Sequence, residues 1–417
     1  MKTISPFDWA AEALEDLKLK NLYRKFRVLE ELKGTRAKVQ GREITLFCGN
    51  DYLGLSQHPR LIEAFQRVAS EWGIGSGSAR LISGTSKWHE ALEERIARFL
   101  GKERVLLFSS GYLANLGVLS SLAGSDDLII LDKLSHASLV DAAHLSKAAV
   151  RVYPHKNLDY LEKILRQHKA RHPEARRAEG SLRDSSASPQ NDRGRVWIVT
   201  DSLFSMDGDL APLPELAELK NRYGAYLVID EAHATGVFGP TGKGVSEHFE
   251  VSDSIDVHIG TLSKALGVFG GFVAGSNELI EYLINHARTF LFDTALPAPV
   301  CAAALQAFDL IGKENSLREK LWSNVKKLRN GLEKIDAPVL QGESPIIPVV
   351  FGDELKTLKA AEFLLREGFL IPAVRYPTVP RGKARLRVTV SSIHSEEDID
   401  RLIFAFKSLV SLADKNS

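Results

Sequence analysis

The chain has 417 residues, of which 44% are hydrophobic and 26% charged, so it can bury a large core and build two domains. Lysine and arginine number 54 against 53 aspartates and glutamates, a balance that gives no reason to expect a nucleic-acid or membrane-surface partner. The two cysteines, Cys48 and Cys301, suit neither a metal site nor a disulfide framework, and no apolar run has the length of a signal peptide or membrane span, so we expect a cytoplasmic protein.

The first 45 residues carry a helical pattern. Apolar residues recur at helical spacing across residues 6–33, at Leu14, Leu17, Leu22, Phe26, Leu29 and Leu32. This spacing is typical of one or two amphipathic helices. Residues 43–47, EITLF, then predict a short strand. We therefore expect residues 1–45 to form an N-terminal helical segment ahead of a large domain.

From about residue 60, helical patterns alternate with short apolar runs. Residues 61–72 and 89–100 predict helices, and seven runs predict strands: RVLLFSSG, DLIILD, AVRVYP, RVWIVTD, AYLVIDE, VHIGT and GGFVAG. Near-continuous apolar strands separated by helices are typical of a mostly parallel sheet covered on both faces. Residues 170–195 are polar and aperiodic, which indicates an exposed insertion. We expect an α/β large domain over residues 46–295.

The pattern changes after residue 296. Long helical stretches (300–334) are followed by PIIPVVFG, a helix at 355–367, LRVTVS and a last helix after HSEEDID. Ser395 and Asp398 have the spacing of a helix-start pair. We expect a smaller α+β domain over residues 296–417.

Several residues, most of them with polar side chains, follow shortly after the predicted strands. They are Gly111, Tyr112, His136, Asp201, Ser205, Asp230, His233, Thr261 and Lys264. In parallel sheets, ligands bind beyond the carboxyl ends of the strands, so these residues are expected in one cleft. Their spacing does not suit a metal. The combination of acid, histidines and lysine suits a planar, phosphorylated, electron-withdrawing cofactor that is bound as a lysine imine.

Each of these residues has a physical reason for its role. Lys264 lies alone in GTLSKALGVFGG (260–271), where burial among small residues favours the neutral amine that an imine and a base require. Asp230 could pair with a protonated pyridine nitrogen, and His233 could hydrogen-bond the phenolic oxygen of the ring. His136 could stack on the ring face. The segment FSSGYLAN (108–115) opens a helix, whose N–H groups could hold a phosphate.

Taken singly, the same residues have structural explanations. Asp230 could cap a helix, either histidine could be a satisfied core residue, and Ser205 could belong to a turn. Their common position at strand ends is what favours the cofactor site.

The motifs resemble those of the α-oxoamine synthase family, pyridoxal 5'-phosphate (PLP) enzymes of fold type I. The matching stretches are NDYLGLS (50–56), GSGSARLISGTSKWHEALE (75–93), FSSGYLAN (108–115), DKLSHASLVD (132–141), TDSLFSMDGDLAPL (200–213), VIDEAHATGVFGPTGKG (228–244), GTLSKALGVFGG (260–271), DTALPAP (293–299) and RYPTVPRGKARLRVTVSSIHSEEDID (375–400). The resemblance covers nearly the whole chain beyond residue 45. The order Asp-x-x-His followed by Thr-x-x-Lys is its most specific part.

The resemblance implies a role for each matching residue. Lys264, Asp230, His233 and His136 would form the catalytic set, and the cofactor would also be held by Gly111, Tyr112, Asp201, Ser205 and Thr261, with Thr294 reaching the phosphate of a neighbouring subunit. Arg387 would grip the carboxylate of the amino-acid substrate, and Asn50 and Thr378 would complete that site. The family implies a homodimer with its active site between subunits, and a large domain with a seven-stranded sheet beside a smaller C-terminal domain.

Four condensation activities occur in such a family. RYPTVP and DTALP favour the condensation of L-alanine with pimeloyl-CoA, or the pimeloyl carrier protein, to give 8-amino-7-oxononanoate for biotin synthesis. The products 2-amino-3-ketobutyrate, 5-aminolevulinate and the serine–palmitoyl condensate stay possible, since Tyr376 and Asp293 depart from the usual pattern. A fold type I aminotransferase stays open too. A non-catalytic partner subunit would typically lack the lysine that this chain has at position 264.

Overall fold

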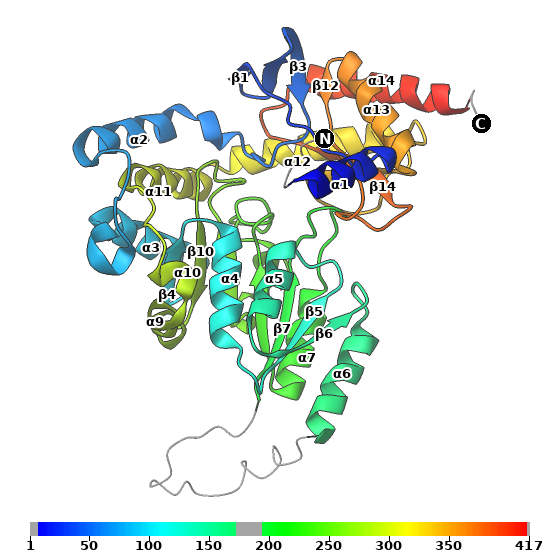
Figure 1. The fold of residues 1–417 in the computed structure, drawn as a ribbon. Helices are drawn as coiled ribbons and strands as arrows, with labels where there is room; N and C mark the ends of the chain where they lie inside the picture. The colour runs from blue at the N-terminus through cyan, green and yellow to red at the C-terminus, as the bar shows by residue number, and fades with distance from the viewer. Residues whose placement is uncertain (1–6, 172–193, 415–417) are drawn as a thin grey trace, which may run out of the picture. The chain divides into compact units, whose positions relative to one another are not determined.

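The computed structural model describes residues 7–171 and 194–414, so the core of the insertion expected at 170–195 lies outside the described residues. The chain forms two compact units (Figure 1). Among the described residues, the sheet unit comprises 55–171, 194–205 and 210–318, and the terminal unit comprises 7–54, 206–209 and 319–414. This division differs from the boundary expected at residue 295, because the helix that follows that residue packs within the sheet unit.

The sheet unit is built on a seven-stranded sheet in the order β4-β10-β9-β8-β7-β5-β6. The strands are β4 (Arg104–Phe108), β5 (Leu128–Asp132), β6 (Ala149–Tyr153), β7 (Val196–Asp201), β8 (Tyr226–Asp230), β9 (Val257–Thr261) and β10 (Gly271–Gly275). Strand β10 is antiparallel to both of its neighbours, and the other pairs are parallel. The mostly parallel sheet predicted from the sequence is therefore confirmed.

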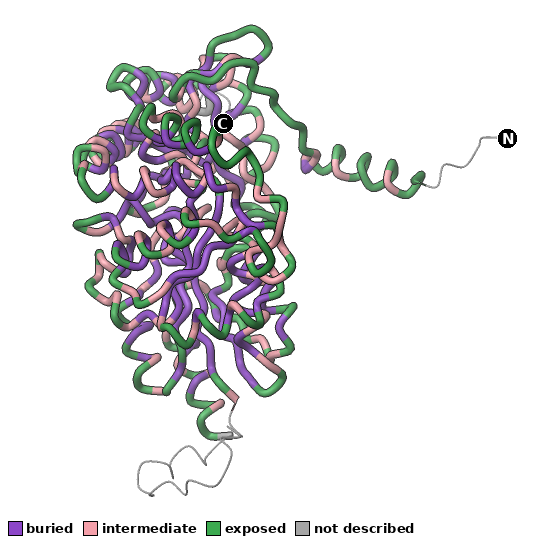
Figure 2. The backbone as a smooth tube through the Cα atoms, turned by 90° about the vertical axis from the view of Figure 1, so that its left-hand side faces the viewer, coloured by how far each residue is buried: buried purple, intermediate pink, exposed green. Residues whose placement is uncertain are grey.

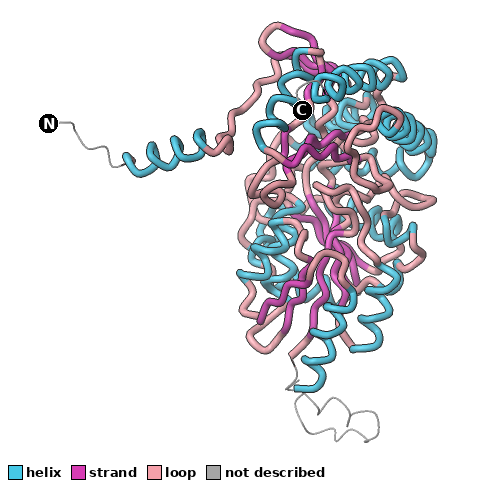
Figure 3. Tube along the Cα trace, turned by 90° about the vertical axis from the view of Figure 1, so that its right-hand side faces the viewer, coloured by secondary structure: helices cyan, strands magenta, loops and turns pink. Residues whose placement is uncertain are grey.

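Burial explains why these strands are apolar throughout. Every residue of β5, β7, β9 and β10 is buried, so both faces of each strand are covered. Figure 2 shows the buried residues along the sheet, and Figure 3 shows helices on either side of its strands. One face packs on α4 (Gly111–Leu122), α5 (Ala137–Leu145) and α9 (Asn277–His286) in a single apolar cluster.

Further helices complete the sheet unit. They are α2 (Pro59–Trp72), α3 (Lys87–Leu100), α6 (Leu158–Arg171), α7 (Leu213–Tyr223), α8 (Val245–His248), α10 (Arg288–Leu291) and α11 (Ala298–Lys313). Helix α11 packs against α2 and α3, and α6 packs against α7. No helix of the described ranges is long and apolar enough to cross a membrane.

The terminal unit contains two small sheets. One has the order β1-β2-β3-β12 and the other β11-β14-β13. Their strands are β1 (Glu31–Lys33), β2 (Arg36–Val39), β3 (Arg42–Leu46), β11 (Ile346–Gly352), β12 (Phe369–Leu370), β13 (Ala373–Val374) and β14 (Ala384–Thr389). The helices are α1 (Asp8–Leu19), α12 (Asn315–Glu333), α13 (Glu354–Arg366) and α14 (Glu396–Asp414), with the first residues of α12 in the sheet unit.

The helical pattern expected over residues 6–33 is wrong beyond residue 19. Helix α1 ends at Leu19, and β1 and β2 form where an N-terminal helical segment was expected, while β3 confirms the strand predicted at residues 43–47. The turn between β2 and β3 has positive φ angles at Gln40 and Gly41, which is the geometry of a tight hairpin. Alternate residues Ala37 and Val39 then pack with Ile44 and with Leu370 of β12, a partner more than 300 residues away.

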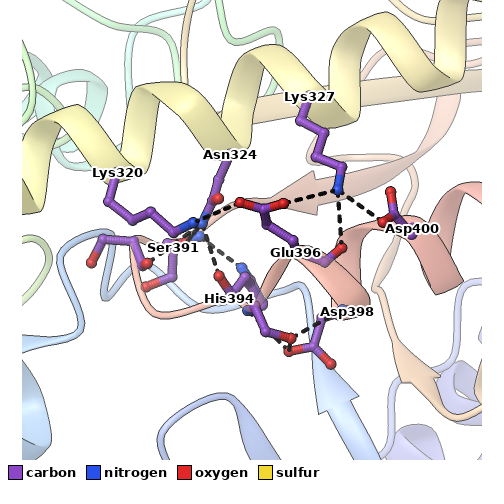
Figure 4. Close-up of polar contacts among 10 residues, drawn as sticks. Lys320, Asn324, Lys327, Ser391, His394, Glu396, Asp398 and Asp400 are labelled. Carbon is purple, nitrogen blue, oxygen red and sulfur yellow. Dashed lines mark hydrogen bonds and ion pairs between the residues drawn. The ribbon is translucent and has the colours of Figure 1, made fainter.

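The start of α14 confirms the helix-start pair read from the sequence (Figure 4). The backbone N–H of Asp398 donates to the Ser395 hydroxyl at 3.1 Å, and the N–H of Ser395 donates to the Asp398 carboxylate at 3.2 Å. Asn324 of α12 holds the preceding loop by donating to the carbonyls of Ser391 and His394, at 3.1 and 3.0 Å. The loop and the helix start are thus fixed to α12.

Candidate active site

Two buried carboxylates lie side by side where β7 and β8 end. Asp201 and Asp230 are directly paired in the register of the two strands. Burial, and then the negative charge of Asp230, raise the pKa of Asp201 well above its usual range. The N–H of His136 donates to Asp201 at 2.8 Å, which ties the start of α5 to this edge. Asp201 is therefore the member of the pair in which the neutral form is favoured.

Two neutral groups hold the Asp230 carboxylate. The side-chain amide of Asn115 donates to one oxygen at 2.7 Å, and the N–H of Ala232 donates to the other at 2.8 Å. Buried charges are usually matched by an opposite charge. A carboxylate that is fixed by neutral donors at the ligand-binding edge of the sheet fits a cationic group such as a protonated pyridine nitrogen.

Lys264 lies half-buried in the turn between β9 and β10. Its carbonyl accepts from the N–H of Gly267 at 2.9 Å, and a Cβ on Gly267 would meet the N of Ser56 at 2.3 Å, so only glycine fits there. Thr261 closes the turn by donating to the carbonyl of Gly270 at 2.8 Å. This turn fixes the backbone from which the Lys264 side chain extends.

His136 is the N-cap of α5, and its environment keeps the ring neutral. Burial lowers the pKa of His136; the negative charge of Asp230, the next largest effect, opposes this, and the positive charge of Lys264 adds to the lowering. The charge of Lys264 also acts on Asp201. The charges of Lys264 and Asp230 thus act on both His136 and Asp201, and the position of these residues in one cleft stays a prediction.

The first turn of α4 offers a place for a phosphate. Ser110 caps the helix by accepting from the N–H of Leu113 at 3.2 Å, while the N–H groups of Gly111 and Tyr112 have no carbonyl within the helix to bind. A Cβ on Gly271 would meet the N of Gly111 at 2.5 Å. Strand β10 therefore lies against this turn only because residue 271 is glycine. The donor set of lysine, carboxylate, hydroxyl groups and helix start fits PLP.

The other predicted cofactor residues of the sheet unit lie near the ends of its strands or on its surface. His233 is buried just beyond β8, and Ser205 is half-buried after β7. Thr294 is exposed and forms an antiparallel bridge with Ala79. Tyr112 is partly exposed, and its hydroxyl donates to Asp141. Their contacts to a cofactor stay predictions.

The predicted carboxylate site belongs to the terminal unit. Arg387 on β14 is buried and donates to the side-chain oxygen of Asn50 at 3.1 Å, and it also hydrogen-bonds the Tyr52 hydroxyl. Asn50 and Arg387 are thus brought together as expected. Thr378 is exposed, and its N–H donates to the carbonyl of Arg375 at 3.0 Å.

Three functional candidates escaped the sequence reasoning. Asn115 follows Gly111 by one helical turn and reaches Asp230, and Ser138 follows His136 by two residues and contacts its ring. Glu231 is fully buried, accepts from the Ser202 hydroxyl at 2.6 Å and accepts from two N–H groups at the start of α8. All three residues lie within the motifs quoted from the sequence, but their contacts become visible only in the folded structure.

Known proteins resemble the chain over nearly all of its length. The model of the family described as "Aminotransferase class I and II" matches residues 42–406. The 8-amino-7-oxononanoate synthase of Thermoanaerobacter pseudethanolicus is 41% identical over 98% of both chains. The synthase of that name from Methylococcus capsulatus is 44% identical over 96% of this chain and 98% of its own.

Solved structures extend the similarity to the fold. A serine palmitoyltransferase from S. paucimobilis with PLP bound superposes with a TM-score of 0.86 at 28% identity, covering 98% of both chains. An 8-amino-7-oxononanoate synthase from Francisella tularensis has a TM-score of 0.72 at 27% identity, covering 89% of this chain and 98% of that one.

Proposed function

Because this chain belongs to the class I and II aminotransferase family and groups there with the 8-amino-7-oxononanoate synthases, we propose that it condenses L-alanine with a pimeloyl thioester. It is a PLP-dependent acyltransferase with the fold type I architecture. Identity of 41–45% to synthases over at least 94% of the chain carries the proposal. The serine palmitoyltransferase structures superpose more closely than the synthase structure but are only 28–31% identical to this chain, so they support the fold more than the substrate.

The sheet unit would hold the cofactor with residues already in place. Lys264 would hold its aldehyde carbon, Asp230 its ring nitrogen and the first turn of α4 its phosphate. His136 would lie on the ring face, and His233 would hydrogen-bond the phenolic oxygen. When bound, PLP supplies an electron sink for negative charge that develops at the Cα atom of the amino acid.

The chain's own groups then perform the proton transfers. The Nζ atom of Lys264, as a neutral amine, would remove the Cα proton of alanine and later return one. The negative charge of Asp230 would hold a proton on the ring nitrogen, and the hydrogen bonds from Asn115 and Ala232 fix the position of its carboxylate. Arg387 would bind the substrate carboxylate. The balanced reaction joins Cα to the thioester carbonyl carbon and releases the thiol and CO2.

A panel of substrates tests this proposal. Purified enzyme with PLP is mixed with alanine, glycine or serine and with pimeloyl, acetyl, succinyl or palmitoyl-CoA, and free thiol is measured. We expect alanine with pimeloyl-CoA to give the highest kcat/KM. Preference for serine with palmitoyl-CoA would overturn the proposed substrate and leave the family intact. Amino-group transfer to a keto acid without thiol release would indicate an aminotransferase.

We also propose that the enzyme is a cytoplasmic homodimer, the state implied by the family resemblance. Thr294 is exposed and half of a short bridge, so it is accessible to a second subunit. A mixed dimer of Lys264→Ala and Thr294→Ala chains tests the sharing of a site. If each site uses Thr294 of the other subunit, one site of the mixed dimer keeps both residues, and its activity should exceed that of either parent.

A further inference from the structure

Between Gly111 and Val118 of α4, two residues have polar side chains. Tyr112 is exposed, whereas the side chain of Asn115 is buried. Its amide nitrogen has two hydrogens and two acceptors from different elements. One is Asp230 of β8, at 2.7 Å, and the other is the hydroxyl of Ser138 on α5, at 2.8 Å. The reverse orientation of the amide would put its oxygen against the Asp230 carboxylate, so these contacts fix which atom is nitrogen.

The direction of the next hydrogen bond follows from these contacts. The N–H of Ser138 donates to Nδ1 of His136 at 3.3 Å, so Nδ1 is an acceptor and carries no proton. The Ser138 hydroxyl lies 2.7 Å from the same nitrogen. Because Nδ1 carries no proton, the hydroxyl donates its hydrogen to Nδ1, while its oxygen accepts from Asn115. The proton of the neutral imidazole is then on Nε2.

One atom of Asn115 shows that the residue is not kept for packing alone. Its side-chain oxygen is buried and has no hydrogen-bond partner among the described residues. An unpaired buried acceptor destabilises a fold, and an apolar residue of the same size would avoid the loss. An apolar residue would, however, lack the two hydrogen bonds that the Asn115 amide donates to Asp230 and Ser138.

We propose that Asn115 is a positioning residue that fixes, through one amide group, both the carboxylate facing the cofactor nitrogen and the tautomer of the imidazole facing the cofactor ring. The inference rests on the proposed PLP site and not on the choice of acyl donor. A neutral donor suits this place, since it orients Asp230 without cancelling the charge that the ring nitrogen needs. An acid at residue 115 would instead add a third carboxylate beside Asp201 and Asp230.

Three variants separate positioning from folding. Asn115→Leu removes both bonds at nearly constant volume, and Ser138→Ala removes only the relay to His136. Asn324→Leu is the matched control, because Asn324 is an equally buried helical asparagine that donates to the carbonyls of Ser391 and His394 in the terminal unit. Each protein is prepared without cofactor, and its melting temperature is measured first.

The readouts are the dissociation constant for PLP, from absorbance titration, and the ¹⁵N chemical shifts of His136 in the apo protein. We expect Asn115→Leu to weaken PLP binding at least tenfold and to shift His136 away from the Nε2–H tautomer. Ser138→Ala should change the His136 shifts while PLP affinity stays within about threefold of the parent. Asn324→Leu should lower only the melting temperature.

Several results would overturn the inference. One is a folded Asn115→Leu protein with parental PLP affinity and parental His136 shifts. If Asn115→Leu does not fold, Ser138→Ala decides, and unchanged His136 shifts in that variant refute the relay. Failure of the parent to turn over pimeloyl-CoA would refute only the proposed substrate, because none of these readouts uses an acyl donor.

Discussion

The two arginines of strand β14 contact different kinds of side chain. Arg385 and Arg387 are two residues apart on β14, and both are buried. Arg385 forms an ion pair with Asp207 at 2.7 Å and donates to the carbonyl of Met206. Arg387 hydrogen-bonds the neutral side chains of Asn50 and Tyr52. The ion pair with Asp207 gives Arg385 a structural role, and the family resemblance assigns the substrate carboxylate to Arg387.

The first prediction follows from this contrast. Arg387→Lys should raise the KM for alanine tenfold or more, because an ammonium cannot replace a guanidinium that binds two oxygens, and about 1.5–3 kcal/mol depends on such a charged bond. Arg385→Lys should lower the melting temperature and leave the KM nearly unchanged. Steady-state kinetics and thermal melts of both variants check this. Exchanged behaviours would move the carboxylate site to Arg385.

Asp230→Asn is the second prediction at this scale. The substitution keeps the shape of the side chain and removes the charge that would hold the ring nitrogen protonated. Exchange of the alanine Cα proton with D₂O should slow by at least a hundredfold, equivalent to about 2.7 kcal/mol, while PLP still binds. The exchange is followed by proton NMR without any thioester. A parental exchange rate would remove Asp230 from the proposed role.

Burial decides which elements the sequence could predict. Strands buried on both faces leave continuous apolar runs, so β4, β5 and β7 to β10 were predicted. Strand β6 was predicted as well, although it lies at the edge of the sheet and is mostly exposed. Of the three N-terminal strands, β3 was predicted from EITLF, and β1 and β2 were not. Strand β1 lies at the end of residues 6–33, whose leucine spacing imitates a helix. The strand-end residues of the site were predicted by topology alone. Asn115 was not, since its role depends on how α4 packs against α5.

The contact of β10 with α4 gives a prediction at the scale of elements. Gly271→Ala would place a methyl group 2.5 Å from the N of Gly111, against backbone that cannot yield cheaply. The first turn of α4 should move, and affinity for PLP should fall at least tenfold with a lower melting temperature. Gly124→Ala is the control, because its Cβ meets only one atom, at 4.0 Å. Equal affinities for the two variants would contradict the phosphate site.

Buried histidines make the stability of the fold depend on pH. Burial lowers the pKa of His394 and of His89 to about 4, and that of His258 to about 3. Histidine in an unfolded chain titrates near 6.5. Each of these residues therefore contributes stability that is fully present above pH 6.5 and is lost as the pH falls toward 4. Buried Asp201 and Glu231 act in the opposite direction, because burial raises their pKa values.

A single substitution isolates one of these contributions. His394 accepts from the N–H of Ser391 at 2.9 Å and donates to the carbonyl of Leu46 at 2.8 Å, so a second proton would abolish the first bond. His394→Gln should be less stable than the parent at pH 7, and the difference should shrink by about 3 kcal/mol by pH 4, because only the parent loses the histidine contribution. Urea denaturation of the apo proteins between pH 7 and 4 measures the difference, and the exposed His144→Gln serves as the control. A difference that stays constant with pH would show that His394 is not the neutral, buried imidazole that these contacts require.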